Sequence, residues 1–181
     1  MPAEATAGTQ ALRIAKFDKA LHDRSGFSCG FGPIDNFLKS SLSEQIKAAF
    51  VMAWIATVGD DPSVLGFYTL GAMAVLANPG PKAWQRAGIP DIPVIYIRVV
   101  AVHKDKQSNG LGTALLIDAM KRCLGIADQL GAAAIALDVL QDDHFDRRRK
   151  FYAELGFHPL GDPDNPQRVF IPMADIRASL A

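Results

Sequence analysis

Apolar positions in the first half of the chain recur at the spacing of strands, interrupted by one stretch at the spacing of a helix. The helix is expected at 34–46, directly after Pro33, a residue that suits the first turn of a helix. The turn-forming residues Gly, Asp, Asp and Pro at 59–62 separate two apolar runs, which predicts an antiparallel hairpin. The strands expected in this half are 12–17, 50–58 and 64–76.

In the second half, a Pro- and Gly-rich loop at 77–93 precedes the β-branched run 94–102. Because this run is almost continuously apolar, it predicts a central strand buried on both faces. From Leu111 the apolar period becomes helical, and Gly131 marks the expected end of that helix. The other expected elements are a strand at 132–139, a helix at 144–155 and a closing hairpin of 157–160 with 169–173. This order of elements predicts a mixed α/β domain without repeats.

Length and composition agree with one globular domain. The chain has 181 residues, of which 49% are hydrophobic and 21% charged, and at this size a core forms without disulfides or metals. Residues 1–10 are rich in small and polar residues and have no apolar period. We therefore expect a flexible N-terminus at 1–10 and a single domain at 11–181.

Charge and cysteine content exclude several classes of function. Nineteen Lys plus Arg balance nineteen Asp plus Glu, so any contact with nucleic acid must come from a local basic patch. Cys29 and Cys123 are too few for a disulfide framework or a zinc site, so we interpret both as reduced packing residues and expect no metal. No basic and apolar leader and no long apolar run is present, which predicts a cytoplasmic protein without a membrane span.

The most informative segment is 103–113, which joins the expected central strand to the next helix. Gly110 and Gly112 let the backbone turn its N–H groups toward one point, to which the helix adds its positive end. Such a nest binds phosphate or pyrophosphate, and a plain glycine turn is the alternative. A P-loop is excluded because its G-x-x-x-x-G-K-[ST] motif is absent, and a dinucleotide fingerprint fits poorly because Leu115 replaces its third small residue.

Two motifs in this order resemble the GNAT superfamily of acetyl-CoA-dependent N-acetyltransferases. They are Q-x-x-G-x-G at 107–112 and F-Y-x-x-x-G-F at 151–157, with a helix and a strand between them. The pair is much more specific than either motif alone. The resemblance implies a central, mostly antiparallel twisted sheet with a splayed central strand and helices on both faces.

The resemblance also implies roles for individual residues. The loop amides would hold the pyrophosphate of acetyl-CoA, and the strand before it would hold the pantetheine arm. Tyr152 would act as the general acid for the departing thiolate, because a phenol with a pKa of about 10 can protonate a thiolate near 8.5. A buried core aromatic is the alternative for Tyr152. The implied cofactor-binding residues are Val100, Val102, Gln107, Ser108, Asn109, Gly110, Leu111, Gly112 and Thr113.

The chain departs from the common pattern at Phe145, where many members carry an Asn that contacts CoA. Asp143 and Asp146 are the candidates to replace this contact. Next to the expected central strand, His103 is interpreted as a lone exposed histidine and not as a base. Trp84, in the long loop, has two open roles, which are to line the acceptor cleft or to cover the sheet.

The segment 22–30, together with 66–70 and 166–173, resembles the GNAT toxins of type II toxin–antitoxin systems. This resemblance implies acetylation of the α-amine of aminoacyl-tRNA and a ribbon-helix-helix antitoxin as partner. For the loop triplet His22-Asp23-Arg24, three roles stay open, namely capping the next helix, contacting tRNA or stabilising the fold.

A basic run before Tyr152 is the candidate phosphate site of such an enzyme. It could receive the phosphates of tRNA or the 3′-phosphate of CoA, and a solvated helix face is the alternative. The run consists of Arg147, Arg148, Arg149 and Lys150.

The expected mechanism is direct attack of a neutral amine on the thioester in a ternary complex. An α-amine has a pKa of about 7.7 to 8.0, so roughly a tenth is neutral at pH 7 and a strong protein base is not required. Two rival hypotheses remain. One is a general GNAT enzyme that acetylates a small amine or a protein N-terminus, and the other is a non-catalytic module that binds CoA or an antitoxin. A homodimer is also left open.

Overall fold

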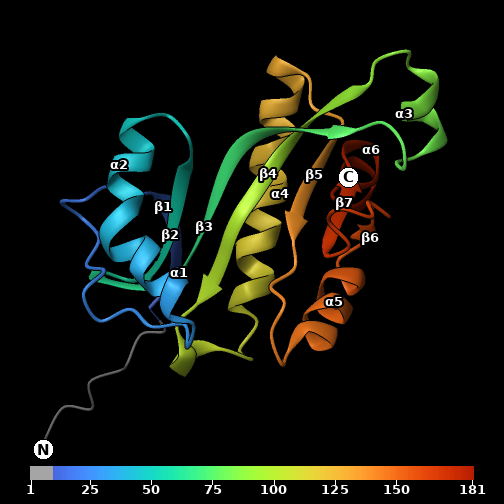
Figure 1. The fold of residues 1–181 in the computed structure, drawn as a ribbon. Helices are drawn as coiled ribbons and strands as arrows, with labels where there is room; N and C mark the ends of the chain where they lie inside the picture. The colour runs from blue at the N-terminus through green and yellow to red at the C-terminus, as the bar shows by residue number, and fades with distance from the viewer. Residues whose placement is uncertain (1–9) are drawn as a thin grey trace, which may run out of the picture.

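The structure, a computed structural model, describes residues 10–181 and centres on a seven-stranded sheet. The strand order is β1-β2-β3-β4-β5-β7-β6, and of the pairings in this sheet the one between β4 and β5 is parallel (Figure 1). The predicted mixed α/β fold with a mostly antiparallel sheet is confirmed. The strands are β1 (Leu12–Lys16), β2 (Met52–Val58), β3 (Asp61–Leu76), β4 (Asp91–Val102), β5 (Ala134–Asp138), β6 (His158–Pro159) and β7 (Arg168–Pro172).

The helices follow the predicted pattern with three short additions. A continuous helical segment formed by α1, η1 and α2 occupies the place of the helix expected at 34–46. The additions are α3 within the predicted loop, η2 in the segment before α4 and α6 after the closing hairpin, and none of them is long enough to show a helical apolar period. The helices are α1 (Gly32–Asn36), the π-helical η1 (Phe37–Ser41), α2 (Leu42–Lys47), α3 (Lys82–Arg86), the 3-10 helix η2 (Lys104–Lys106), α4 (Leu111–Leu130), α5 (Phe145–Glu154) and α6 (Met173–Ser179).

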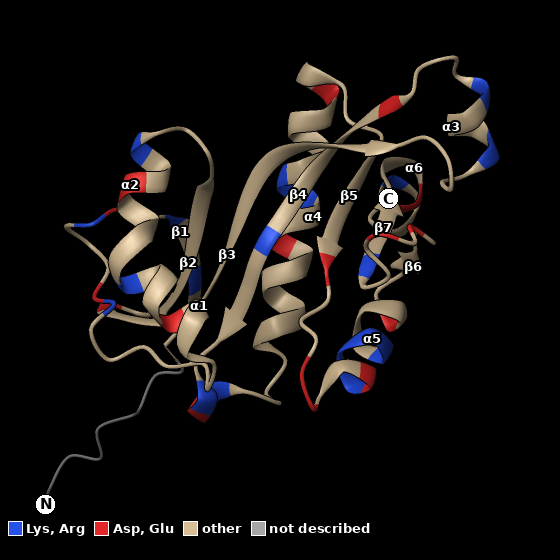
Figure 2. Ribbon diagram, viewed as in Figure 1, with Lys and Arg blue, Asp and Glu red and all other residues tan. Residues whose placement is uncertain are grey.

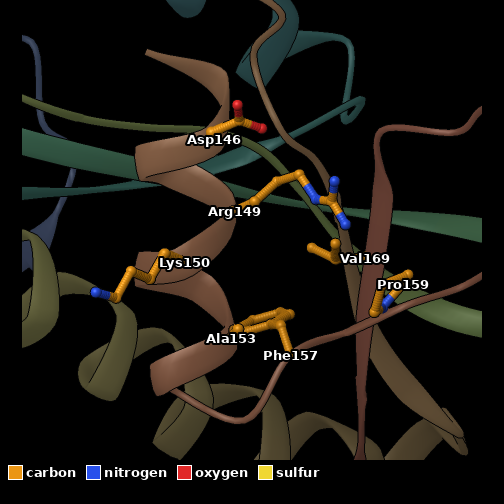
Figure 3. A pocket seen from close by; sticks show the side chains of 7 residues that line it. All are labelled: Asp146, Arg149, Lys150, Ala153, Phe157, Pro159 and Val169. Carbon is orange, nitrogen blue, oxygen red and sulfur yellow. The ribbon is translucent and has the colours of Figure 1, made fainter.

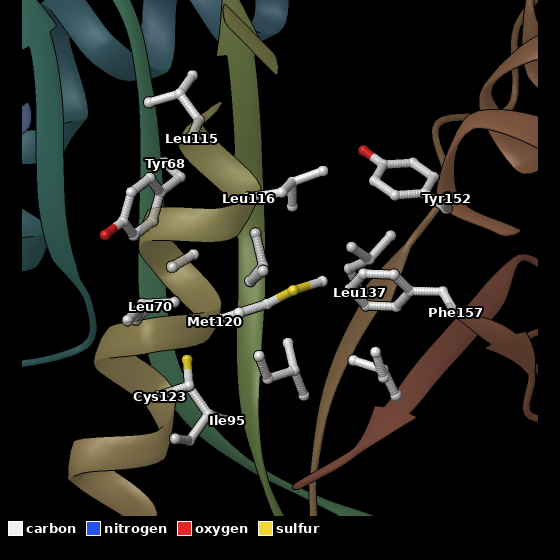
Figure 4. Close-up of a cluster of buried hydrophobic side chains, with 14 of the residues drawn as sticks. Tyr68, Leu70, Ile95, Leu115, Leu116, Met120, Cys123, Leu137, Tyr152 and Phe157 are labelled. Carbon is white, nitrogen blue, oxygen red and sulfur yellow. The ribbon is translucent and has the colours of Figure 1, made fainter. Parts of the chain in front are cut away.

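The sheet has a hydrophobic core on each face, because successive strand residues point to opposite sides. On one face, which we call the α2 face, Phe67 packs with Leu38 and Leu42 of η1 and α2. On the other, which we call the α4 face, Tyr68 belongs to the core that α4 covers with residues such as Leu115 (Figure 4). Helices on both faces of the sheet were expected, and this is confirmed.

The middle of β4 departs from a regular ladder on both of its edges. Arg98 and Val99 together lie opposite Thr69 of β3, which makes a β-bulge. On the other edge, β4 pairs with β5 only over Val94–Ile97, and the remainder of β4 continues without a β5 partner. This divergence is the splayed central strand that the resemblance implied.

The expectation that 94–102 is buried on both faces is therefore wrong for its second half. Arg98 is exposed, and Val99, Val100 and Val102 are only partly buried. The physical reason is the loss of β5 as a neighbour, which leaves one edge of β4 open.

Two further expectations concern the ends and the surface of the chain. The flexible terminus expected at 1–10 lies outside the described residues except for Gln10. Within residues 10–181, no helix combines the length and the apolar character that crossing a membrane requires.

Candidate functional site

The divergence of β4 and β5 opens a cleft of about 520 Å³. Its walls come from the second half of β4, the loop before α4, the end of β5 and one side of α5. Asn109 and Leu111 are outside this lining, and Leu111 packs into the core on the α4 face. The residues expected at a site that do line the cleft are Val100, Val102, Gln107, Ser108, Gly110, Gly112, Thr113, Arg147, Arg148 and Tyr152.

The loop before α4 presents unpaired backbone N–H groups to the cleft. Gly110 is the N-cap of α4 with φ of +80°, a conformation that favours glycine, and Ser108 also has a positive φ of 63°. The amides in the first turn of a helix have no intrahelical partner, and here no side chain caps them either. A 20-residue helix with an uncapped N-terminus facing a cleft attracts an anion.

Gln107 anchors this loop. Its Nε2 donates hydrogen bonds to the carbonyl oxygens of Cys29, at 2.9 Å, and Val102, at 3.0 Å. The side chain thereby ties the end of β4 to the segment that precedes α1. The resulting contacts are internal, so the Gln107 side chain supports the loop whatever its backbone binds.

His103 supports the same loop and is not the exposed residue that the sequence suggested. Its side chain is only 19% exposed. Nδ1 accepts a hydrogen bond from the backbone N–H of Asp105 at 3.2 Å, and the ring packs edge-on against Phe27 at 5.8 Å. These contacts indicate a structural role for His103.

Tyr152 is 8% exposed and lies in the wall of the cleft. Its ring packs against Phe151 and Phe157, with centroid distances of 5.3 and 5.7 Å. In Figure 4 the hydroxyl points away from Phe157. Burial raises the pKa of Tyr152 to about 12, so the hydroxyl keeps its proton at neutral pH.

The basic run of α5 is divided between two sides of the helix. Arg147 and Arg148 line the cleft, and Nη2 of Arg147 donates to Oγ of Ser108 at 3.3 Å. Arg148 is paired with Asp142, which lowers the pKa of that carboxyl. Arg147 therefore stands beside the anion-attracting loop.

Arg149 and Lys150 border a different pocket, of about 270 Å³, with an apolar floor that includes Phe157 and Val169. Figure 3 shows Arg149 extending from α5 across this pocket. Basic residues cluster along α5 in Figure 2. The basic run at 147–150, expected to receive phosphate, is thus divided between two pockets on different sides of α5.

Three residues considered from the sequence are placed away from the cleft. Asp143 and Asp146 do not line it, and His144 occupies the corresponding stretch of the wall. Trp84 packs against Phe170 at 5.1 Å, in a cluster that covers the α2 face of the sheet. Of its two open roles, the contacts of Trp84 support the covering one.

The triplet 22–24 binds other parts of the fold. Nη1 of Arg24 donates to the carbonyl oxygen of Leu38 at 2.8 Å, and its guanidinium lies 5.1 Å from the ring centre of Phe17. The backbone N–H of Ser25 donates to Asp23, whose pKa this bond lowers. Stabilising the fold is the role that these contacts support.

Both cysteines are free thiols. Cys29 lines the cleft, where burial raises its pKa to about 11, and Cys123 is buried in the core, where burial raises its pKa to about 12. A thiol with so high a pKa supplies little thiolate at neutral pH and is a poor nucleophile. Among residues 10–181, no group of three His, Cys, Asp or Glu side chains is placed to hold a metal ion.

Three polar residues of the cleft wall were not expected from the sequence: Arg98 on the bulge of β4, Asp138 at the end of β5 and His144 just before α5. Asp138 accepts hydrogen bonds from Arg168 and from Tyr96. The signals in the sequence were a charged residue inside the apolar run of β4 and another at the end of the apolar run of β5. The partners of these residues could not be read from it.

Comparison with known proteins identifies similar chains over nearly the whole length. The model of the Acetyltransferase (GNAT) family matches residues 32–157. A probable toxin TacT of Sinorhizobium fredii is 35% identical over 96% of this chain and 98% of its own, and a tRNA-acetylating toxin of Mycobacterium tuberculosis is 33% identical over 86% and 89%. A solved structure of a tyrosine-to-phenylalanine mutant of the toxin AtaT, bound to the C-terminus of the antitoxin AtaR and acetyl-CoA, is 25% identical with a TM-score of 0.78, over 94% and 98%.

Proposed function

This chain belongs to the GNAT family of acetyltransferases, and on that premise we propose that it acetylates the α-amino group of aminoacyl-tRNA with acetyl-CoA. One observation carries the proposal. A single cleft combines an uncapped helix N-terminus, the open edge of a splayed strand and a protonated buried tyrosine. These are the parts needed to bind a pyrophosphate, hold an extended arm and protonate a leaving thiolate.

In the proposed complex, the pyrophosphate of acetyl-CoA lies on the amides of 107–113. The pantetheine arm follows β4 along Val100 and Val102, where no β5 partner occupies the backbone groups. Gln107 keeps the loop in place through its bonds to Cys29 and Val102. The structure of AtaT with acetyl-CoA supports this choice of cosubstrate.

The proposed chemistry is direct acetyl transfer without an acyl-enzyme. The nitrogen of a neutral amine forms a bond to the thioester carbonyl carbon, the carbon–sulfur bond breaks, and Tyr152 gives its proton to the departing sulfur. The proton released by the amine passes to water, and Tyr152 regains a proton from solvent. The high thiol pKa of Cys29 supports this route over one through an acyl-cysteine.

The α-amine is favoured as acceptor over a lysine amine because of its lower pKa. At pH 7 roughly a tenth of an α-amine is neutral, against about one in two thousand for a lysine near 10.4. In the cleft wall, the carboxylate of Asp138 is bound by Arg168, His144 lies at the start of α5, and His103 lies outside the lining. An acceptor with so low a pKa can lose its proton to water and does not require either group as a strong base.

A toxin of this kind requires an antitoxin, which we propose as the protein partner of this chain. The complex of AtaT with the C-terminus of AtaR supports the proposal. A ribbon-helix-helix fold for that partner is carried over from the resemblance. Arg147 and Arg148, in the cleft wall, are proposed to bind cofactor phosphate, and Arg149 and Lys150 to bind tRNA phosphate.

The deciding experiment incubates the protein with radiolabelled acetyl-CoA and total aminoacyl-tRNA, with deacylated tRNA as the matched control. We expect label on the charged tRNA alone. Label that appears instead on polyamines or peptides would favour a general acetyltransferase. Binding of acetyl-CoA without transfer to any acceptor would favour a non-catalytic module.

A further inference from the structure

Asp138 is the last residue of β5 and lies where β4 and β5 separate. Its side chain is 24% exposed and lines the same cleft as Tyr152. Neither the loop motif nor the tyrosine motif includes this residue. A carboxylate at this point of the cleft therefore needs its own explanation.

The carboxylate is held rigidly. Nε of Arg168 donates to Oδ1 at 2.7 Å, Nη2 of Arg168 donates to Oδ2 at 2.9 Å, and the hydroxyl of Tyr96 donates to Oδ2 at 3.0 Å. Because Arg168 is only 12% exposed, the guanidinium holds Asp138 in one orientation. Burial and the charge of Asp138 raise the pKa of Tyr96 to about 12, so this donor stays protonated.

The carboxylate has one acceptor position left. An ionised carboxylate offers about four lone-pair positions, of which the three bonds above use three. The free position belongs to Oδ1, and the Asp138 side chain as a whole is partly exposed and lines the cleft. A ligand group that donates a hydrogen bond, and above all a cationic one, completes this site.

Arg98 provides a positive group on the same side of the sheet. Tyr96 and Arg98 are two residues apart in β4 and so share the α2 face, opposite to Ile97 on the α4 face. Arg98 and Asp138 both line the cleft. Nη1 of Arg98 donates to Gln45 at 2.8 Å, and the exposed guanidinium keeps other N–H groups for an anion.

We propose that Asp138 and Arg98 form the acceptor subsite on the α2 face. Asp138 accepts a hydrogen bond from the α-ammonium of the aminoacyl ester as it binds, before this group loses a proton to water and reacts as the neutral amine, and Arg98 binds a phosphate of the adjoining nucleotides. This inference rests on the proposed function and adds to it the residues that recognise the acceptor. An α-ammonium beside a phosphate is a pairing that an aminoacyl-tRNA end presents and a simple amine does not.

The test compares three variants on two acceptors. The variants are Asp138→Asn, Arg98→Gln and, as the matched control, Asp162→Asn, which removes another carboxylate near Arg168 that does not line the cleft. The acceptors are aminoacyl-tRNA and 3′-O-aminoacyl-adenosine, which has the ammonium but no phosphate. The thermal shift with acetyl-CoA checks the fold of each variant.

We expect Asp138→Asn to raise KM about 10- to 100-fold for both acceptors, the loss expected for a hydrogen bond to a charged group. Arg98→Gln should raise KM for aminoacyl-tRNA and leave KM for aminoacyl-adenosine unchanged. Asp162→Asn should stay within about twofold of the wild type for both acceptors.

A measurement on the wild type alone removes any dependence on folding of the variants. Aminoacyl-adenosine should bind at least about 10-fold more tightly than α-hydroxyacyl-adenosine, in which a hydroxyl replaces the ammonium. Equal binding of the two, or equal KM values for Asp138→Asn and Asp162→Asn, would overturn the role of Asp138. An equal effect of Arg98→Gln on both acceptors would overturn the role of Arg98. Failure of the proposed function looks different, because the wild type would then transfer no acetyl group to either acceptor.

Discussion

Tyr68 and Tyr152 are both buried tyrosines, but their hydroxyl groups meet different surroundings. The Tyr68 hydroxyl donates to Asp118 at 2.6 Å, which ties β3 to α4. Among residues 10–181, the Tyr152 hydroxyl makes no side-chain hydrogen bond and is not fully closed off from solvent, and the side chain lines the cleft. A hydroxyl that packs against a cleft without a partner is available for a ligand.

Replacing Tyr152 with Phe should lower kcat by about 10² to 10⁴, the range for a positioned acid, and leave the acetyl-CoA thermal shift intact. The matched control is Tyr68→Phe, which should keep kcat and lose roughly 1 kcal/mol of unfolding free energy through the Asp118 bond. Steady-state kinetics and denaturant unfolding measure the two effects. An unchanged kcat in Tyr152→Phe would show that Tyr152 only packs in the core and has no catalytic role.

The dependence of the reaction on pH follows from the same residue. Because burial raises the pKa of Tyr152 to about 12, this group stays protonated below about pH 10. Its ionisation therefore causes no decrease of kcat/KM in that pH range. The acceptor amine must be neutral, so kcat/KM should rise with pH and level off near its pKa of about 8. A falling limb between pH 7 and 9 in the profile of kcat/KM would contradict Tyr152 as the acid.

At the scale of the element, the two ends of α4 provide a matched pair of glycines. Gly110, with φ of +80°, precedes the uncapped first turn, and Gly131, with φ of +78°, ends the helix far from the cleft. In both places an added Cβ meets no atom within 4 Å. The cost of replacing either glycine is therefore conformational, and only Gly110 lies at the proposed pyrophosphate site.

We expect Gly110→Val and Gly131→Val each to lower the free energy of unfolding by about 1–2 kcal/mol, the cost of a left-handed conformation. Acetyl-CoA at a concentration of 100 times Kd should raise the free energy of unfolding by about 2.7 kcal/mol. This stabilisation should be lost in Gly110→Val and kept in Gly131→Val. Thermal shift assays with and without acetyl-CoA compare the two. Equal gains in both variants would mean that the loop is not the cofactor site.

The two sides of α5 lead to a separate prediction. Arg147 contacts Ser108 of the loop, whereas Arg149 borders the pocket on the other side of the helix. If Arg147 holds the 3′-phosphate of CoA, the wild type should have a lower KM for acetyl-CoA than for its 3′-dephospho form, and Arg147→Gln should lose this preference. Arg149→Gln should retain the preference. If the wild type has the same KM for acetyl-CoA as for its 3′-dephospho form, no contact to the 3′-phosphate exists.

At the scale of the whole molecule, the formal net charge is zero, so electrostatic binding of tRNA depends on local basic groups. Only a few phosphates can then be neutralised, so we expect a shallow dependence of tRNA KM on salt. Neutralising Arg149 and Lys150 together should raise this KM and lower the salt slope by up to about 0.9 per lost contact. Measuring KM from low to physiological salt tests this, and an unchanged slope would indicate that the pair is a solvated surface.

The sequence by itself determined the elements and motifs whose signal is local. The helical period from Leu111 to Gly131 predicted α4, and the turn at 59–62 predicted the β2–β3 hairpin, because hydrophobic spacing and glycine conformation act over a few residues. The loop at 107–112 with Tyr152 identified the family for the same reason. Short elements such as α3 and α6 were not predicted, since one or two helical turns contain too few positions to show an apolar period.

Only the tertiary structure decided which distant residues meet at the cleft and directly behind its wall. Tyr96, Asp138 and Arg168 come from three strands, and they meet because β4, β5 and β7 are neighbours in the sheet. The basic run of α5 looks continuous in sequence, yet the rotation of a helix sends Arg147 toward the cleft and Arg149 toward another pocket. Side-chain direction and strand order arise from packing across the whole core, and these long-range contacts leave no local pattern in the sequence.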